Sequence, residues 1–116
     1  MMLSHRNPDE LSSQADLAAS VMRSIAHRGR LLVLCYLADE GEMSAGELVR
    51  RIGLGQSALS QHLSRLRADG LVETRKVAQS VIYRIADERV VRLLSALHDI
   101  YCPAIRIVRS VEPDRD

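Results

Sequence analysis

The amino-acid sequence predicts a mainly α-helical chain that carries one small β-hairpin. Three observations indicate this fold class: apolar residues repeat at helical spacing along most of the chain, a capping box opens a helix at Ser44, and two alternating segments follow Gly70. A chain of 116 residues can bury one hydrophobic core. We therefore expect a single domain over residues 1–116, with residues 1–8 and 104–116 as flexible termini.

Two helices are predicted in the first third of the chain. Pro8 suits the first turn of a helix that runs to about Ala26, with an apolar stripe that begins at Leu11 and ends at Ile25. A second, apolar helix contains residues 31–37. Cys35 lies within this second helix.

The middle of the chain contains two helices joined by a glycine-rich turn. Ser44 as N-cap and Glu47 at the third helical position form a capping box that opens a helix ending near Ile52. Residues 53–55, Gly-Leu-Gly, then interrupt the chain before a helix that Gly70 ends. This pattern predicts a helix-turn-helix, whose second helix reads DNA bases from its N-terminal end.

A β-hairpin is predicted directly after these helices. Residues 71–76 and 81–85 alternate in polarity as strands do, and residues 77–80 form the turn between them. A helix-turn-helix followed by such a hairpin is a winged helix-turn-helix, in the order of four helices, two strands and a final helix.

The final helix is predicted to start near Asp87 and to carry apolar stripes, as the first helix does. Together these stripes exceed what the core of one small domain needs. We therefore expect a homodimer formed through the first and last helices, with the two recognition helices in successive major grooves.

The positive charge is concentrated in the predicted DNA-binding segment. Residues 44–84 carry seven basic and three acidic side chains, a net charge of +4, whereas the segments before and after carry −2 and −1. In the recognition helix, the side chains predicted to contact DNA are Gln56, Ser57, Ser60, Gln61, His62 and Arg65. In the hairpin they are Arg75, Lys76 and Gln79.

The sequence resembles the ArsR/SmtB family of small bacterial winged-helix repressors. The resemblance covers roughly residues 15–102, and its most specific part is the run SALSQHLSRLRADGLV at 57–72. Within the family, the chain is most similar to BigR/SqrR-type regulators that respond to sulfide and persulfide. That similarity implies double-stranded operator DNA as partner, reactive sulfur species as inducer, and no cofactor.

The resemblance also implies a sensing pair, Cys35 and Cys102. In such a regulator the reduced dimer binds DNA, and a persulfide or polysulfide linkage of the two cysteines releases it. A direct disulfide would need Cα atoms within about 7 Å of each other. Each cysteine alone is more often an inert buried side chain, and a general oxidant sensor is an alternative.

A metal-responsive repressor is the other alternative. One family metal site uses cysteines where this chain has Ser44, Ala45 and Gly46, and the other keeps only Asp87. At the remaining positions of that second site the chain has Arg89, Ile100 and Pro103. Both sites are broken, so no metal is expected, although Cys35, His98 and Cys102 remain a possible unusual soft-metal site.

Other function classes lack their signatures. The chain has no glycine-rich phosphate loop, no nucleophile elbow and no metal-hydrolase spacing of its histidines, so it is not predicted to be an enzyme. Three tyrosines and no Phe or Trp leave little for RNA base stacking. No export signal and no apolar run near 18 residues are present, so we expect a cytoplasmic protein with no membrane partner.

Overall fold

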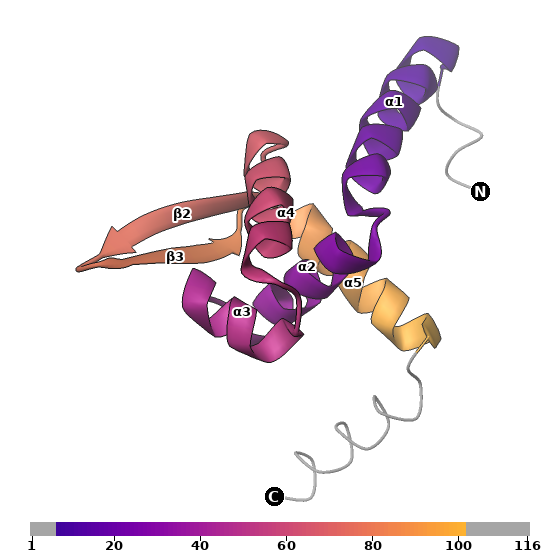
Figure 1. The fold of residues 1–116 in the computed structure, drawn as a ribbon. Helices are drawn as coiled ribbons and strands as arrows, with labels where there is room; N and C mark the ends of the chain where they lie inside the picture. The colour runs from indigo at the N-terminus through magenta and orange to yellow at the C-terminus, as the bar shows by residue number, and fades with distance from the viewer. Residues whose placement is uncertain (1–6, 102–116) are drawn as a thin grey trace, which may run out of the picture.

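The computed structural model describes residues 7–101, which form five helices and a three-stranded antiparallel sheet (Figure 1). In chain order, the elements are α1 (Pro8–Ile25), α2 (Arg28–Glu40), β1 (Met43–Ser44), α3 (Ala45–Ile52), α4 (Gln56–Ala68), β2 (Val72–Val77), β3 (Ser80–Ile85) and α5 (Glu88–Tyr101). The predicted winged helix-turn-helix is confirmed. The predictions for the termini lie outside the described residues, except that Asn7 caps α1 and Pro8 begins it.

The hydrophobic core lies where α2, α3, α4 and α5 meet the base of the sheet. Its largest fully buried side chains are Val33, Leu34, Leu37, Leu48, Leu59, Leu66 and Val90. Each of these helices therefore contributes at least one side chain that is removed from water, which fixes the position of α4 on the body of the molecule.

The predicted capping box at the start of α3 is present. The Ser44 hydroxyl accepts a hydrogen bond from the Glu47 amide at 3.1 Å, and the Glu47 carboxylate accepts one from the Ser44 amide at 2.9 Å. These two contacts satisfy backbone donors that the first turn would otherwise leave unpaired. Gly53 then ends the helix in the left-handed region, with φ of 84°.

The recognition helix α4 ends in a Schellman motif. Gly70 has φ of 79°; its amide donates to the Arg67 carbonyl, and the Leu71 amide donates to the Leu66 carbonyl at 2.9 Å. Leu66 and Leu71 are both buried, which supplies the apolar contact typical of this motif. The chain thereby reverses from α4 into β2 with its backbone groups paired.

The sheet has one strand more than the predicted hairpin. The short strand β1 pairs with β3, with Met43 opposite Tyr83 and Ser44 opposite Ile82, and the strand order is β1-β3-β2. The turn between β2 and β3 is also shorter than predicted, because the strands extend to Val77 and Ser80. Its first residue, Ala78, has a φ of 55°.

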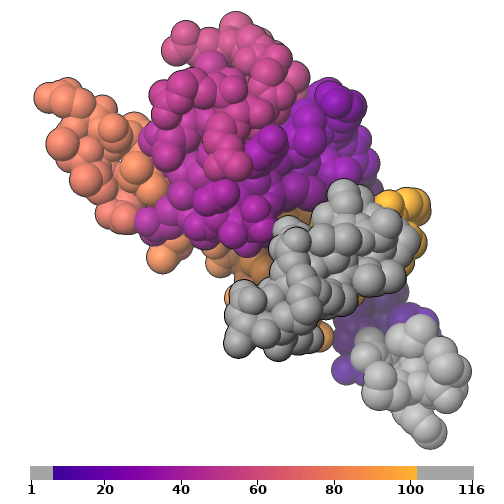
Figure 2. Space-filling model, turned by 90° about the horizontal axis from the view of Figure 1, so that it is seen from below, coloured from indigo at the N-terminus to yellow at the C-terminus, as the bar shows by residue number. Residues whose placement is uncertain are grey.

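Helix α1 extends away from the body of the molecule, at the opposite end from the β2–β3 hairpin (Figures 1 and 2). Residues 7–20 are all exposed, and α1 meets the core at its C-terminal end, where Val21 packs against the core and Ser24 and Ile25 are buried. Leu17 and Met22 are 50% and 53% exposed. Within residues 7–101, no helix combines the length and the apolar character needed to cross a membrane.

Candidate functional site

The exposed face of α4 consists of small and polar side chains. Leu59, Leu63 and Leu66 point into the core, which leaves the opposite side of the helix to solvent. The members of this recognition face are Gln56, Ser57, Ser60 and Gln61. Gly55 is the N-cap and has no side chain to accept from the first-turn amides, so these donors remain available to an anion such as a DNA phosphate.

Arg65 lies one turn beyond the recognition face and forms an ion pair with Asp69. The Arg65 Nε donates to the Asp69 carboxylate at 2.8 Å, and the Ser24 hydroxyl of α1 donates to the same carboxylate. The hydrogen bond from Ser24, followed by the one from Arg65, lowers the pKa of Asp69. Asp69 thus connects the predicted DNA-binding arginine to the end of helix α1.

His62 is placed differently from the other predicted DNA contacts in α4. It is half-buried and lies against His27, with the ring centroids 4.4 Å apart. Burial, followed by the charges of His27 and Arg30, lowers the pKa of His62. A Cβ atom added to Gly29 would lie 2.6 Å from the His62 Nε2. The His62 ring therefore faces the start of α2 and helps to pack α4 against α2.

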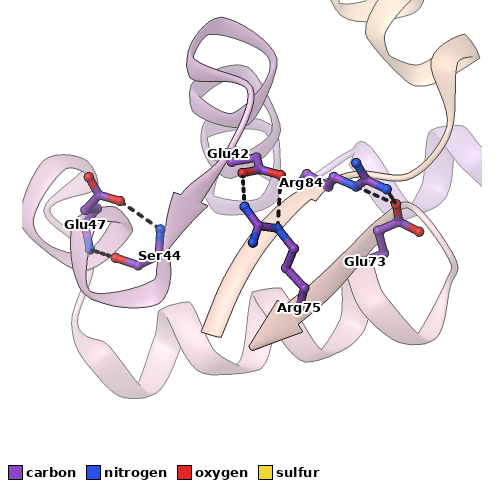
Figure 3. Close-up of polar contacts among 6 residues, drawn as sticks. All are labelled: Glu42, Ser44, Glu47, Glu73, Arg75 and Arg84. Carbon is purple, nitrogen blue, oxygen red and sulfur yellow. Dashed lines mark hydrogen bonds and ion pairs between the residues drawn. The ribbon is translucent and has the colours of Figure 1, made fainter. Parts of the chain in front are cut away.

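The hairpin carries the other three predicted contacts. Lys76 and Gln79 are exposed, and Gln79 is in the turn. Arg75 is exposed but forms an ion pair with Glu42, at 2.6 Å from Nη2 to the carboxylate (Figure 3). These three residues therefore belong to the β2–β3 wing, which projects to one side of α4 (Figure 1).

Cys35 is exposed and lines a cleft of about 300 Å³ between α2 and α5. The lining residues are Cys35, Tyr36, Ala38, Asp39, Leu94, Ser95, His98 and Asp99. Cys35 is exposed because the buried face of α2 is formed by Val33, Leu34 and Leu37. Cys35 is therefore not an inert core side chain, while Cys102 lies outside the described residues, one position after the end of α5.

The described residues do not form a complete metal centre. Within residues 7–101, no three His, Cys, Asp or Glu side chains are gathered closely enough to hold a metal ion. Cys35 and His98 do line the same cleft, but the third member of the possible soft site, Cys102, lies outside this range.

Comparison with known proteins identifies the family. Residues 27–74 match the family model described as bacterial regulatory protein, arsR family. The chain is 42% identical over 94 residues to the HTH-type transcriptional regulator YgaV of Escherichia coli, covering 81% of this chain and 95% of YgaV. It is 45% identical over 98 residues to the transcriptional activator HlyU of Vibrio cholerae, covering 84% and 90% of the two chains.

Solved structures agree with this result. Reduced HlyU from Vibrio cholerae superposes with a TM-score of 0.75 at 45% identity, covering 80% of this chain and 97% of HlyU. The transcriptional repressor BigR from Xylella fastidiosa superposes with a TM-score of 0.76 at 37% identity, covering 84% and 98%. The fold, the exposed α4 face and these relatives define a winged helix-turn-helix transcriptional regulator. The chain belongs to the ArsR family of bacterial regulatory proteins.

Proposed function

We propose that the chain is a homodimeric repressor that binds two-fold operator DNA and is released by reactive sulfur species. The recognition face of α4 reads base edges, and Arg65, Arg75, Lys76 and Gln79 contact the DNA backbone or the minor groove. In this proposal, His62 positions α4 by packing it against α2. The main support for the proposed sensing of reactive sulfur is that Cys35 is exposed in the α2–α5 cleft.

The proposed dimer is supported by the apolar side chains that one protomer leaves exposed. Leu11 and Leu17 of α1 are 41% and 50% exposed, and Ile100 and Tyr101 at the end of α5 are 64% and 76% exposed. Burial of such side chains in a two-fold interface stabilises the assembly and holds two α4 helices at a fixed spacing.

The proposed release step forms a sulfur bridge between Cys35 and Cys102. A donor persulfide transfers its outer sulfur to the Cys35 thiolate and leaves as a thiol. The thiol of Cys102 then joins this outer sulfur to give a trisulfide, and a second donor persulfide accepts the two electrons and two protons as it becomes a thiol and hydrogen sulfide. The donor thus supplies both the added sulfur and the oxidising equivalents.

A bridge at the α2–α5 cleft would act on DNA binding through the elements it joins. Helix α2 contacts both α4 and α3, and α5 carries part of the proposed dimer surface. Linking them favours one arrangement of the two recognition helices over another, and couplings of this kind are typically about 1–3 kcal/mol.

Single-cysteine variants test this function. Cys35→Ser and Cys102→Ser should bind an operator duplex as tightly as wild type, because neither residue belongs to the proposed DNA-binding surface. Unlike wild type, both should keep binding after treatment with a glutathione persulfide donor. Wild type should lose about fivefold or more of its affinity. Loss of DNA binding by both untreated variants would instead assign the cysteines a folding role.

A metal-responsive repressor remains the second candidate, because Cys35 and His98 line one cleft. The two functions differ in how release is reversed. A chelator empties a metal site, whereas a sulfur bridge is reversed by a reductant.

A further inference from the structure

Four charged side chains form a cluster on the outer face of the wing. The cluster consists of Glu42, Glu73, Arg75 and Arg84 (Figure 3). In the strand register, Glu73 lies opposite Arg84 and Arg75 lies opposite Ile82, so these side chains share one face of the sheet. Glu42 joins them because it directly precedes β1, whose Met43 pairs with Tyr83.

Within this cluster, Glu42 binds the Nε and Nη2 edge of the Arg75 guanidinium in a bidentate contact. The Glu42 carboxylate accepts from Nη2 at 2.6 Å and from Nε at 3.4 Å. Arg84 pairs separately with Glu73 at 2.6 Å. The hydrogen bond from Arg75 is the main reason that the pKa of Glu42 is lowered, so Glu42 is ionised at neutral pH.

We infer that Glu42 limits DNA affinity by competing with a DNA phosphate for Arg75. This inference rests on the proposed role of Arg75 as a backbone contact. Glu42 occupies the Nε–Nη2 edge of the guanidinium, so a phosphate can form a bidentate contact with that edge only after Arg75 leaves Glu42. The Glu42 carboxylate also repels the approaching phosphate, because both groups are negative and the pair is partly exposed.

The expected consequence is a regulator that leaves DNA more readily than its basic residues alone would allow. Phosphate contacts carry no base information, so Glu42 should weaken binding to operator and to unrelated DNA by the same factor. Glu42 thus sets the overall affinity of the regulator, while the α4 face sets its sequence preference.

Glu42→Gln tests this inference, because it removes the charge and keeps the size of the side chain. Binding of the full chain to a fluorescein-labelled mixed-sequence duplex of about 30 base pairs is followed by anisotropy between about 50 and 200 mM salt. We expect Glu42→Gln to bind about three- to tenfold more tightly than wild type, with a salt slope steeper by about 0.9. Thermal unfolding of each variant checks that the fold is retained.

Glu73→Gln is the matched control, since it removes the same charge from the same face but leaves the Glu42–Arg75 pair in place. It should change affinity by less than about twofold. In the double variant Glu42→Gln/Arg75→Ala, the gain in DNA affinity should disappear, because position 75 no longer has a guanidinium that the loss of Glu42 could release.

Each contrary result has a distinct meaning. Equal gains in Glu42→Gln and Glu73→Gln would reduce the effect to net charge and overturn the inference. No gain in Glu42→Gln, while Arg75→Ala weakens binding, would also overturn it but keep Arg75 as a DNA contact. Unchanged binding by Arg75→Ala would remove the wing contact itself from the proposed function, and with it the role of Glu42.

Discussion

His62 belongs to the recognition helix but faces α2, where it packs against His27 and the backbone of Gly29. The neutral ring is favoured there, because burial and the neighbouring His27 and Arg30 oppose a positive charge. Stability therefore depends on the protonation state of a side chain that holds the DNA-reading helix in place.

The sign of this dependence follows from the lowered pKa of His62. In the unfolded chain His62 binds a proton at higher pH than in the folded chain, so the unfolded state holds more protons as the pH falls below about 6.5. The stability contributed by neutral His62 is complete above that value and is lost as the pH falls through the folded pKa. We expect the free energy of unfolding in urea to decrease between about pH 7.5 and 5.5.

His62→Gln is the variant that assigns this effect, because glutamine does not titrate. It should show a smaller loss of stability over the same pH range, whatever its stability at neutral pH. Asp69 and Glu42 titrate below this pH range, because their pKa values are lowered. A pH dependence identical to that of wild type would therefore mean that His62 is not the source of the effect.

The position of His62 against α2 could have been predicted from the sequence, although His62 stands among the predicted DNA contacts. His62 lies three residues after Leu59 and four before Leu66, at the edge of the apolar face. The Arg65–Asp69 ion pair has i,i+4 spacing and could have been predicted. The ion pair of Arg75 with Glu42 and the hydrogen bond of Ser24 to Asp69 could not, because their partners are 33 and 45 residues apart. Contacts at such separations depend on the folded arrangement.

Among the elements, helices were predicted more accurately than strands. The ends of α3 and α4 could be predicted from capping residues and leucine spacing. Ser44, Glu47 and Gly70 set these ends through contacts with residues nearby in the sequence. Strand β1 has only two residues, too few to show alternation, and it exists because β3 offers an edge to pair with. For the same reason, the ends of the wing strands depend on their partner and extend further into the turn than their sequence indicated.

The wing turn provides a prediction about element stability. Ala78 adopts φ of 55°, a left-handed conformation that residues other than Gly, Asn and Asp disfavour. Ala78→Gly should therefore raise the free energy of unfolding by about 0.5–1 kcal/mol in urea titrations. Ala58→Gly, an exposed position inside α4, is the control and should lower it by about 0.5–1 kcal/mol. A destabilising Ala78→Gly would mean that the turn tolerates alanine without strain.

At the scale of the whole molecule, the exposed apolar side chains of α1 predict how the protein assembles. Leu11→Asp should shift the protein from dimer to monomer in sedimentation analysis, because a charge would be buried in the proposed two-fold interface. Ser12→Asp on the same helix is the control, since Ser12 lies on a different face of α1 from both Leu11 and Leu17. A Leu11→Asp dimer as stable as wild type would place the interface elsewhere.

The measurement that tests the central claim most directly is intact mass spectrometry of the wild-type protein after treatment with a glutathione persulfide donor, with operator binding measured on the same sample. We expect the treated protein to have gained at least one sulfur atom and lost two hydrogens, and no longer to bind DNA. A reductant should restore both the original mass and DNA binding. An unchanged mass, with binding lost only when zinc or another soft metal is added, would contradict the sulfur-sensing claim and assign the cleft at Cys35 to a metal.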